Sequence, residues 1–189
     1  MSKRKIAILG ATGTVGQRFV QLLDGHPWFE VSVLTGSSRT VNSHYGETCN
    51  WVLPGDMPAW ARTMTVEETA PGLDAEIVFS ALPSDQAKDL ELSFAQAGYQ
   101  VFSNASAHRT GNDVPLIIPE VNAHHADLVV AQREKRGWSG CLVTSCNCTS
   151  TGLTVSLKPL LDTFGIKQVF VVSLQALSGA GYPGVSSLD

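Results

Sequence analysis

Residues 5–16, KIAILGATGTVG, allow the architecture of this chain to be inferred. Residues 5–9 predict a buried strand whose residues 6–9 are all apolar, and three glycines follow at three-residue spacing: Gly10, Gly13 and Gly16. Glycines let a strand turn tightly into a helix and let the backbone approach a pyrophosphate, which the helix N-terminus then binds. The segment predicts a nucleotide-binding strand–loop–helix unit at the start of an α/β fold. That fold is a Rossmann-like, doubly wound and mostly parallel sheet.

The helix expected after this loop has one apolar side and a glycine stop at Gly25. The residues expected on its buried side are Val15, Phe19, Leu22 and Leu23. A tight turn without any ligand is the alternative interpretation of the loop.

Composition limits the possible partners and compartments. The 189 residues are enough for one domain and few for two, and the formal net charge of −4 gives no reason to expect a nucleic-acid partner. The apolar run before Gly10 is too short for a signal peptide or a membrane span, so no membrane partner is expected. Four cysteines without a secretion signal favour the cytoplasm, with free thiols. No metal site is predicted, because the spacing of Cys141, Cys146 and Cys148 lacks paired CxxC units and a nearby histidine.

The end of the second expected strand, residues 30–34, indicates which nicotinamide cofactor is bound. An acidic residue at that end binds the ribose 2′-hydroxyl of NAD. This chain has TGSSRT at residues 35–40, with hydroxyls and Arg39 in place of an acid. Because a guanidinium binds phosphate with a planar pair of donors, the sequence predicts NADP rather than NAD. An ordinary solvated charge is the alternative for Arg39.

Two further strands end in residues that can line a ligand site. Residues 74–82 predict a strand followed by a helix over 84–98, and ligands lie over the carboxyl ends of strands in a doubly wound sheet. Ser80 and Leu82 are therefore expected near the cofactor. Residues 99–102 predict the next strand, and the polar segment 103–109 after it suits an anionic ligand near Arg109, with a surface turn as the alternative. The region 41–75 between strands is irregular, with one short strand expected near residues 64–66.

Further elements are expected at residues 114–118, a short apolar strand, and at 123–136, a helix. Its neighbouring histidines, His124 and His125, point to different sides of a helix and are poor joint ligands.

Residues 141–161, CLVTSCNCTSTGLTVSLKPLL, predict a short buried strand, a polar turn and a helix that begins at Cys148. Unpaired N–H groups at a helix start carry partial positive charge and stabilise a thiolate. Asn147 and Thr149 flank the cysteine with hydrogen-bonding groups. A thiolate in a dinucleotide-binding chain predicts attack on a carbonyl carbon followed by hydride transfer. A buried, inert cysteine is the alternative.

The last part of the chain predicts a central strand over residues 168–177, followed by a glycine-rich turn. By strand alternation Gln175 faces away from the valines and could lie at a site. Left unpaired, this apolar strand is expected to be disordered, or to pair with another copy and drive oligomerisation.

Six motifs occur in order along nearly the whole chain: GATGTVGQ, SSR, NASAHR, IPEVN, SCNCTSTG and QALSGAG. Together they resemble the aspartate-semialdehyde dehydrogenase family, and most closely its fungal and archaeal branch. The resemblance implies an NADP-dependent oxidoreductase that converts L-aspartyl-4-phosphate to aspartate semialdehyde and phosphate. The product would feed lysine, threonine, methionine and isoleucine synthesis. The resemblance also implies a homo-oligomer.

The resemblance implies a role for each matching position. Cys148 would form the thioester beside Asn147, and Gln175 would orient the acyl group. Asn104 and Arg109 would bind the phosphate or substrate anion. The cofactor would be held at the pyrophosphate by Gly10, Thr12, Gly13, Thr14 and Val15, at the 2′-phosphate by Ser38 and Arg39, and near the nicotinamide by Gly179 and Gly181.

The chain also differs from the family, whose members are longer. Residues 1–150 would be the NADP-binding domain and 151–189 the start of a catalytic and dimerisation domain, left incomplete. That domain supplies a histidine acid/base and an arginine for the substrate carboxylate, yet no histidine follows Cys148 here. We therefore expect little activity from this polypeptide alone. The alternatives are another thiol-dependent reductase, acting on an acyl phosphate or a short acyl-CoA, and an NADP-binding module without catalysis.

Overall fold

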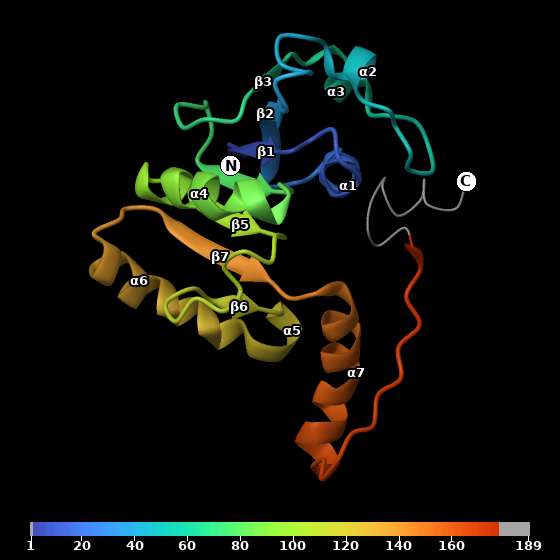
Figure 1. The fold of residues 1–189 in the computed structure, drawn as a ribbon, viewed down its shortest axis with the longest axis vertical. Helices are drawn as coiled ribbons and strands as arrows, with labels where there is room; N and C mark the ends of the chain where they lie inside the picture. The colour runs from blue at the N-terminus through green and yellow to red at the C-terminus, as the bar shows by residue number, and fades with distance from the viewer. Residues whose placement is uncertain (1, 178–189) are drawn as a thin grey trace.

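The structure is a computed structural model that describes residues 2–177. Its centre is a seven-stranded sheet of order β3-β2-β1-β4-β5-β7-β6, in which every pair of neighbours is parallel (Figure 1). The strands are β1 Arg4–Leu9, β2 Phe29–Gly36, β3 Val66–Glu68, β4 Ile77–Ser80, β5 Gln100–Ser103, β6 Leu116–Ile117 and β7 Cys141–Ser145. The predicted doubly wound α/β fold is confirmed.

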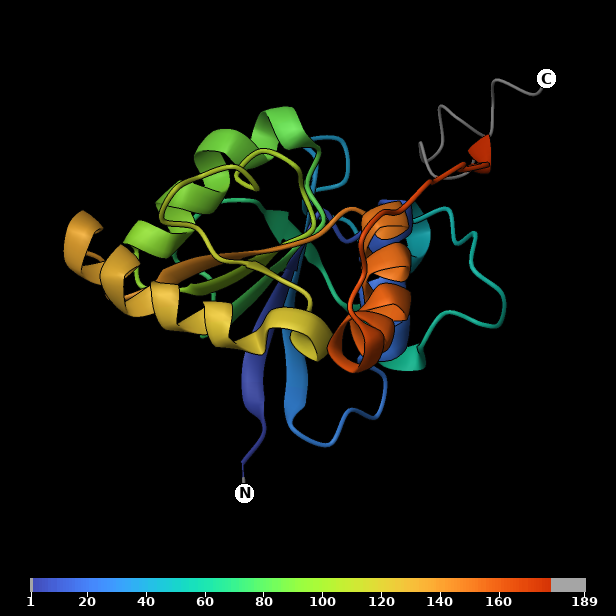
Figure 2. The same ribbon diagram turned by 90° about the horizontal axis from the view of Figure 1, so that it is seen from below.

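Helices connect these strands and cover the sheet (Figures 1 and 2). They are α1 Thr14–Leu22, α2 Tyr45–Thr48, α3 Ala59–Thr63, α4 Ser84–Gln96, α5 Pro119–Asn122, the 3-10 helix η1 Ala123–Asp127, α6 Leu128–Arg136 and α7 Cys148–Phe164. The single helix predicted over residues 123–136 is in fact η1 followed by α6, which ends at Gly137 with φ +66°.

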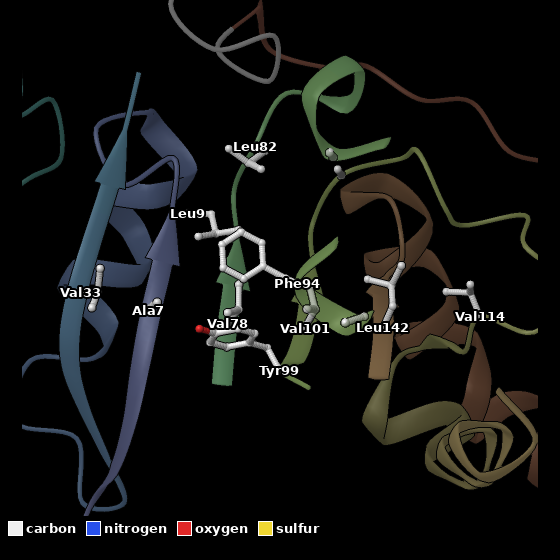
Figure 3. Packing of buried hydrophobic residues seen from close by; sticks show 13 residues of the cluster. Ala7, Leu9, Val33, Val78, Leu82, Phe94, Tyr99, Val101, Val114 and Leu142 are labelled. Carbon is white, nitrogen blue, oxygen red and sulfur yellow. The ribbon is translucent and has the colours of Figure 1, made fainter. Parts of the chain in front are cut away.

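Alternation along the strands divides the core into two layers, one on each face of the sheet. In β1, Ala7 and Leu9 pack on the α4 side against Phe94 (Figure 3). Ile8 faces the other way and packs with Val20 of α1 and with Tyr45 of α2. Burial on both faces explains why residues 6–9 of β1 form a continuous apolar run.

The region between β2 and β4 has more structure than its sequence suggests. It forms α2 and α3, and β3 lies two residues later than expected, beside β2. Tyr45, Met57 and Ala61 of this region are buried in the second core layer. The region therefore packs on the α1 side of the sheet.

The expected buried side of α1 is only partly right: Phe19 and Leu23 are half-buried and pack on the second core layer, but the fully buried side is rotated about the helix axis. Val15 and Leu22 are 47% and 64% exposed, whereas Gly16, Gln17 and Val20 are buried. A Cβ atom at Gly16 would lie only 2.3 Å from the Gly10 carbonyl oxygen. Because only a glycine fits at this contact, the side of α1 that carries Gly16 faces the loop, and the side that carries Val15 and Leu22 does not.

The strand expected at residues 168–177 does not form. After Phe164 the chain turns back and runs alongside α7 without a strand partner among the described residues (Figures 1 and 2). Phe170, Val172 and Leu174 are 87%, 94% and 101% exposed. A β-strand is stabilised by hydrogen bonds to its neighbour, and this segment has none in the described sheet.

Helix α7 is also mostly uncovered: it contacts α5, but none of its residues is fully buried. The helix has apolar residues at helical spacing, and three of them, Leu160, Leu161 and Phe164, are 49%, 52% and 80% exposed. Within the described range, none of the helices has the length and apolar character needed to cross a membrane.

Candidate functional site

The glycine-rich loop has the backbone geometry that a pyrophosphate site requires. Gly10 adopts φ +70°, and a Cβ atom there would lie 3.0 Å from the Ala81 carbonyl oxygen. Gly13 precedes α1 without a side-chain cap, so the first N–H groups of this nine-residue helix, at Thr14 and Val15, have no capping side chain. These groups and the positive end of the helix dipole favour an anion at this position.

Two buried side chains hold the carbonyl groups of this loop. The Tyr45 hydroxyl donates a hydrogen bond of 2.8 Å to the Ala11 oxygen, and Gln17 Nε2 donates one of 3.0 Å to the Thr12 oxygen. Gln17 Oε1 also accepts from the Val52 backbone N–H at 2.9 Å. The region between β2 and β4 thus fixes the loop, through Tyr45 directly and through the contact of Val52 with Gln17. Sequence reasoning missed both side chains, although Gln17 ends the motif GATGTVGQ.

Two polar hollows lie on either side of Ser37, at the carboxyl end of β2. One has a volume of about 340 Å³ and is lined by Thr12, Ser37, Arg39, Thr40, Thr48 and Asn50. Arg39 is exposed there and forms no ion pair with any described residue. The guanidinium of Arg39 and the glycine-rich loop therefore line the same hollow.

The second hollow, of about 490 Å³, is lined by Gly36, Ser37, Ser38, Val41, Asn42, Glu68, Thr69 and Gln86. Ser38 therefore lines a different hollow from Arg39. Sequence reasoning found no acid after β2, but Glu68 reaches this position from β3, where it pairs with Gly36.

The two residues predicted to lie near the cofactor at the carboxyl end of β4, Ser80 and Leu82, have buried side chains. The Ser80 hydroxyl is fully buried and faces Glu91 of α4, so a cofactor contact through this hydroxyl is not supported. Alternation explains this placement, because Val78 and Ser80 point to the α4 side of the sheet and Phe79 to the α1 side. Leu82 is also buried and packs 3.5 Å from the Cβ position of Gly10.

Asn104 and Arg109 come together where β5 and β7 end. Arg109 Nε donates to the Ser145 carbonyl oxygen at 3.0 Å, and its Nη2 donates to the Asn104 carbonyl oxygen at 2.8 Å. Ser145 Oγ in turn donates to Asn104 Oδ1 at 2.5 Å. These contacts use two of the five N–H donors of the guanidinium group. The half-buried arginine thus links two strand ends and keeps donors for an anion.

An apolar groove of about 260 Å³ lies against these strand ends on the α1 side of the sheet. Its walls are aromatic and aliphatic, and Asn104 and Ser145 line its polar end. The lining residues are Phe19, Phe79, Phe102, Ser103, Asn104, Ile117, Pro119, Val143, Thr144 and Ser145.

Cys148 is the first residue of α7 and follows β7 after two residues. Asn147 caps the helix, because its Oδ1 accepts from the Ser150 backbone N–H at 3.1 Å. Cys148 is exposed, with its Sγ 4.0 Å from Thr149 Oγ1. The strand, turn and helix start are as predicted, and burial of this sulfur in apolar packing is excluded.

The other cysteines have different surroundings. Cys49 and Cys141 are buried, and burial raises the pKa of both thiols. Cys146 is half-buried. Cys148 is therefore the most accessible thiol at the carboxyl edge of the sheet.

Known proteins resemble this chain in the order of its elements and in its sequence. Residues 5–129 match the family described as "Semialdehyde dehydrogenase, NAD binding domain". The chain belongs to this semialdehyde dehydrogenase family. It is 52% identical over 184 residues to the aspartate-semialdehyde dehydrogenase of Archaeoglobus fulgidus, an alignment that covers 97% of this chain and 53% of the relative. The resemblance to the archaeal and fungal proteins is thereby confirmed.

Two further comparisons bear on cofactor and substrate in this semialdehyde dehydrogenase family. A malonyl CoA reductase (NADP) of Metallosphaera sedula is 43% identical over 98% of this chain and 52% of the relative. The crystal structure of aspartate semialdehyde dehydrogenase with NADP from Candida albicans superposes with a TM-score of 0.80. It is 40% identical, and the match covers 87% of this chain and 48% of that one. The chain spans about half the length of the curated relatives it matches.

Three predicted site residues of this semialdehyde dehydrogenase family member are not placed with the glycine-rich loop, Arg39, Asn104 or Arg109. Gln175 is exposed in the segment after α7 and forms no described contact with the site. Gly179 and Gly181 lie outside the described residues. The structure thus brings together the glycine-rich loop with Arg39, and Asn104 with Arg109, at the carboxyl edge of one sheet.

Proposed function

We propose that this chain binds NADP and uses Cys148 as the acyl-accepting nucleophile of an aspartate-semialdehyde dehydrogenase. The observation that carries the proposal is the exposed Cys148 at the start of a 17-residue helix. Helix α7 follows β7 at the carboxyl edge of the parallel sheet, where the glycine-rich loop also lies. The family match and the aspartate-semialdehyde dehydrogenase relatives support the same assignment.

The described residues fit NADP. The first N–H groups of α1, together with Gly10, Thr12 and Gly13, would hold the pyrophosphate, with no Cβ atom in the way at the two glycines. Arg39 lines the same hollow as Thr12 and is free to pair with a 2′-phosphate. Ser38 would contact the adjoining ribose from its own hollow. The NADP-bound relative from Candida albicans supports this choice of cofactor.

The chemistry assigned to the chain begins at the thiolate of Cys148. Its sulfur attacks the carbonyl carbon of an acyl phosphate, the carbon–sulfur bond forms, and phosphate leaves with the carbon–oxygen bonding pair. Bound NADPH would supply the hydride that reduces the resulting thioester. Backbone N–H groups at the start of α7 can stabilise the oxyanion in both steps. Expulsion of the thiolate then releases the aldehyde and restores Cys148.

The anion site and the remaining parts of the protein follow from this assignment. Arg109 and Asn104 would bind the phosphate of L-aspartyl-4-phosphate, and Asn147 would fix the turn that carries Cys148. Gln175 would orient the acyl group once its segment is covered. Residues 1–150 would form the cofactor domain and 151–189 the beginning of a second one. The uncovered apolar side of α7 favours a homo-oligomer.

A second candidate function is the reduction of a short acyl-CoA. The relative from Metallosphaera sedula, a malonyl CoA reductase, favours this alternative at 43% identity. Both reactions would use the same thiolate and the same nicotinamide cofactor, and they differ in whether phosphate or a thiol leaves.

Acyl transfer to the chain tests the proposal and separates the two candidates. The purified chain is mixed with fresh L-aspartyl-4-phosphate or with malonyl-CoA, and intact-mass spectrometry detects a hydroxylamine-sensitive adduct. We expect an adduct from aspartyl phosphate in wild type and none in Cys148→Ser. An adduct from malonyl-CoA alone would favour the second candidate. Absence of any adduct, or one that persists in Cys148→Ser, would contradict both.

A further inference from the structure

One buried carboxyl group has no part in the proposed reaction. Glu91 lies in the middle of α4 on its buried side, with Ala87, Phe94 and Ala95, and its exposed fraction is 0%. The pattern of α4 calls for an apolar residue at this position. A fully buried carboxyl group is costly unless its oxygens are paired, which indicates a role beyond filling space.

The partners of Glu91 come from the strand ends that form the candidate site. Ser103 Oγ, at the end of β5, donates to Glu91 Oε1 at 2.6 Å. Glu91 Oε2 lies 3.9 Å from His108 Nε2. The Ser80 hydroxyl, at the end of β4, faces the same carboxyl group, although neither Ser80 Oγ nor Oε2 makes a well-formed hydrogen bond within the described residues. Burial raises the pKa of Glu91, and Ser103, Ser80 and His108 partly offset that effect.

These contacts hold the segment 103–109 against α4 at several points. Ser103 Oγ, besides donating to Glu91, accepts from the Ala105 backbone N–H at 3.0 Å. His108 Nε2 also lies 3.3 Å from the Ala87 carbonyl oxygen. The segment then continues directly into Arg109, whose guanidinium bonds to Ser145. A continuous set of contacts therefore runs from Glu91 to the arginine at the anion site.

We propose that Glu91 is a positioning residue that holds the segment 103–109 so that Arg109 presents its guanidinium to the anionic group of the substrate. This inference rests on the proposed function for the identity of the ligand at Arg109. The geometric part, control of the Arg109 side chain by Glu91, stands on the contacts alone.

The test follows the Arg109 Nε–H proton by NMR in the 189-residue chain, with Arg109→Lys used to assign its resonance. In Glu91→Leu we expect exchange of this proton with solvent to become about tenfold faster, as loss of a local hydrogen bond gives. The internal control is Arg133 Nε–H, which donates to the Gly140 carbonyl oxygen at 3.0 Å from α6. Its exchange rate should not change.

Two more variants make the outcome independent of how well Glu91→Leu folds. Ser103→Ala removes one bond from the same contact set and should accelerate exchange at Arg109 alone. Glu91→Gln keeps an oxygen that can accept from Ser103 and should restore the wild-type rate. Unchanged exchange at Arg109 in Glu91→Leu and Ser103→Ala would overturn the proposal. Equally faster exchange at Arg109 and Arg133 would also overturn it, because it would show that the whole fold is destabilised and not the segment 103–109 alone.

A separate titration distinguishes failure of this inference from failure of the proposed function. Inorganic phosphate is added to wild type while the Arg109 Nε–H resonance is followed. A saturable shift supports Arg109 as the anion site. No shift, with the variant effects still present, would reject the anion role and retain Glu91 as the residue that positions Arg109.

Discussion

At the scale of single residues, Arg39 is the group to which we assign the preference for NADP over NAD. Its guanidinium is exposed and shares a hollow with Thr12 of the glycine-rich loop. We expect Arg39→Ala to weaken NADPH binding by about 10- to 100-fold, the range that loss of a charge-assisted hydrogen bond gives. NADH binding should change little. Fluorescence titration of both cofactors measures the two affinities.

The control for this prediction is Arg4→Ala. Arg4 begins β1 at the opposite edge of the sheet, where it pairs with Glu76 at 2.8 Å on the surface. NADPH affinity should be unchanged in this variant. Equal weakening of NADPH and NADH by Arg39→Ala would show that Arg39 does not recognise the 2′-phosphate.

At the scale of elements, Gln132 of α6 completes the edge of β7. Strand β6 is two residues long and does not reach Leu142, whose backbone N–H donates to Gln132 Oε1 at 2.8 Å. The Leu142 carbonyl oxygen accepts from Gln132 Nε2 at 3.0 Å. We expect Gln132→Leu to lower the free energy of unfolding by about 2–4 kcal/mol, because two buried backbone groups lose their partner. Urea denaturation measures the change, and Gln96→Leu, at an exposed position of α4, should be nearly neutral.

A second prediction at this scale concerns the contact between α6 and the segment before β6. Arg136 donates two hydrogen bonds to Asp113, one of them 2.9 Å long, and they lower the pKa of that carboxyl. Because the folded-state pKa is depressed, this stabilisation is present above the unfolded value of about 3.9 and is lost as pH falls through the folded value.

Asp113→Asn should therefore lower the free energy of unfolding at pH 7 by about 1–3 kcal/mol. The difference from wild type should shrink as pH falls below about 4, where Asp113 of the unfolded chain takes up a proton, and vanish once pH falls below the lowered folded-state pKa. Urea titrations at several pH values provide the comparison. Asp162→Asn, which breaks an exposed pair with Lys158, should have little effect at any pH. A difference that stayed constant down to low pH would contradict the assigned role of Asp113.

At the scale of the whole molecule, local signals predicted the parts of the site that local structure determines. The loop from Gly10 to Gly16 and the turn before Cys148 depend on neighbouring residues, and both form as expected. Tyr45 contacts the loop from 34 residues away, and Glu91 of α4 contacts Ser103 of the next element, β5, so no pattern within one element predicts these contacts. Residues 168–177 have strand composition, but a strand also requires a neighbour, and the described sheet offers none.

The most direct test of the account as a whole is the rate at which iodoacetamide alkylates Cys148 at pH 7, mapped by peptide mass spectrometry. The same rate is measured in the urea-unfolded chain. Exposure alone cannot make a folded thiol react faster than an unfolded one, whereas a thiolate stabilised by the start of α7 can. We predict that Cys148 reacts about tenfold faster in the folded protein, while the buried Cys49 and Cys141 react more slowly than when unfolded. A folded-state rate at Cys148 equal to or below the unfolded rate would contradict it.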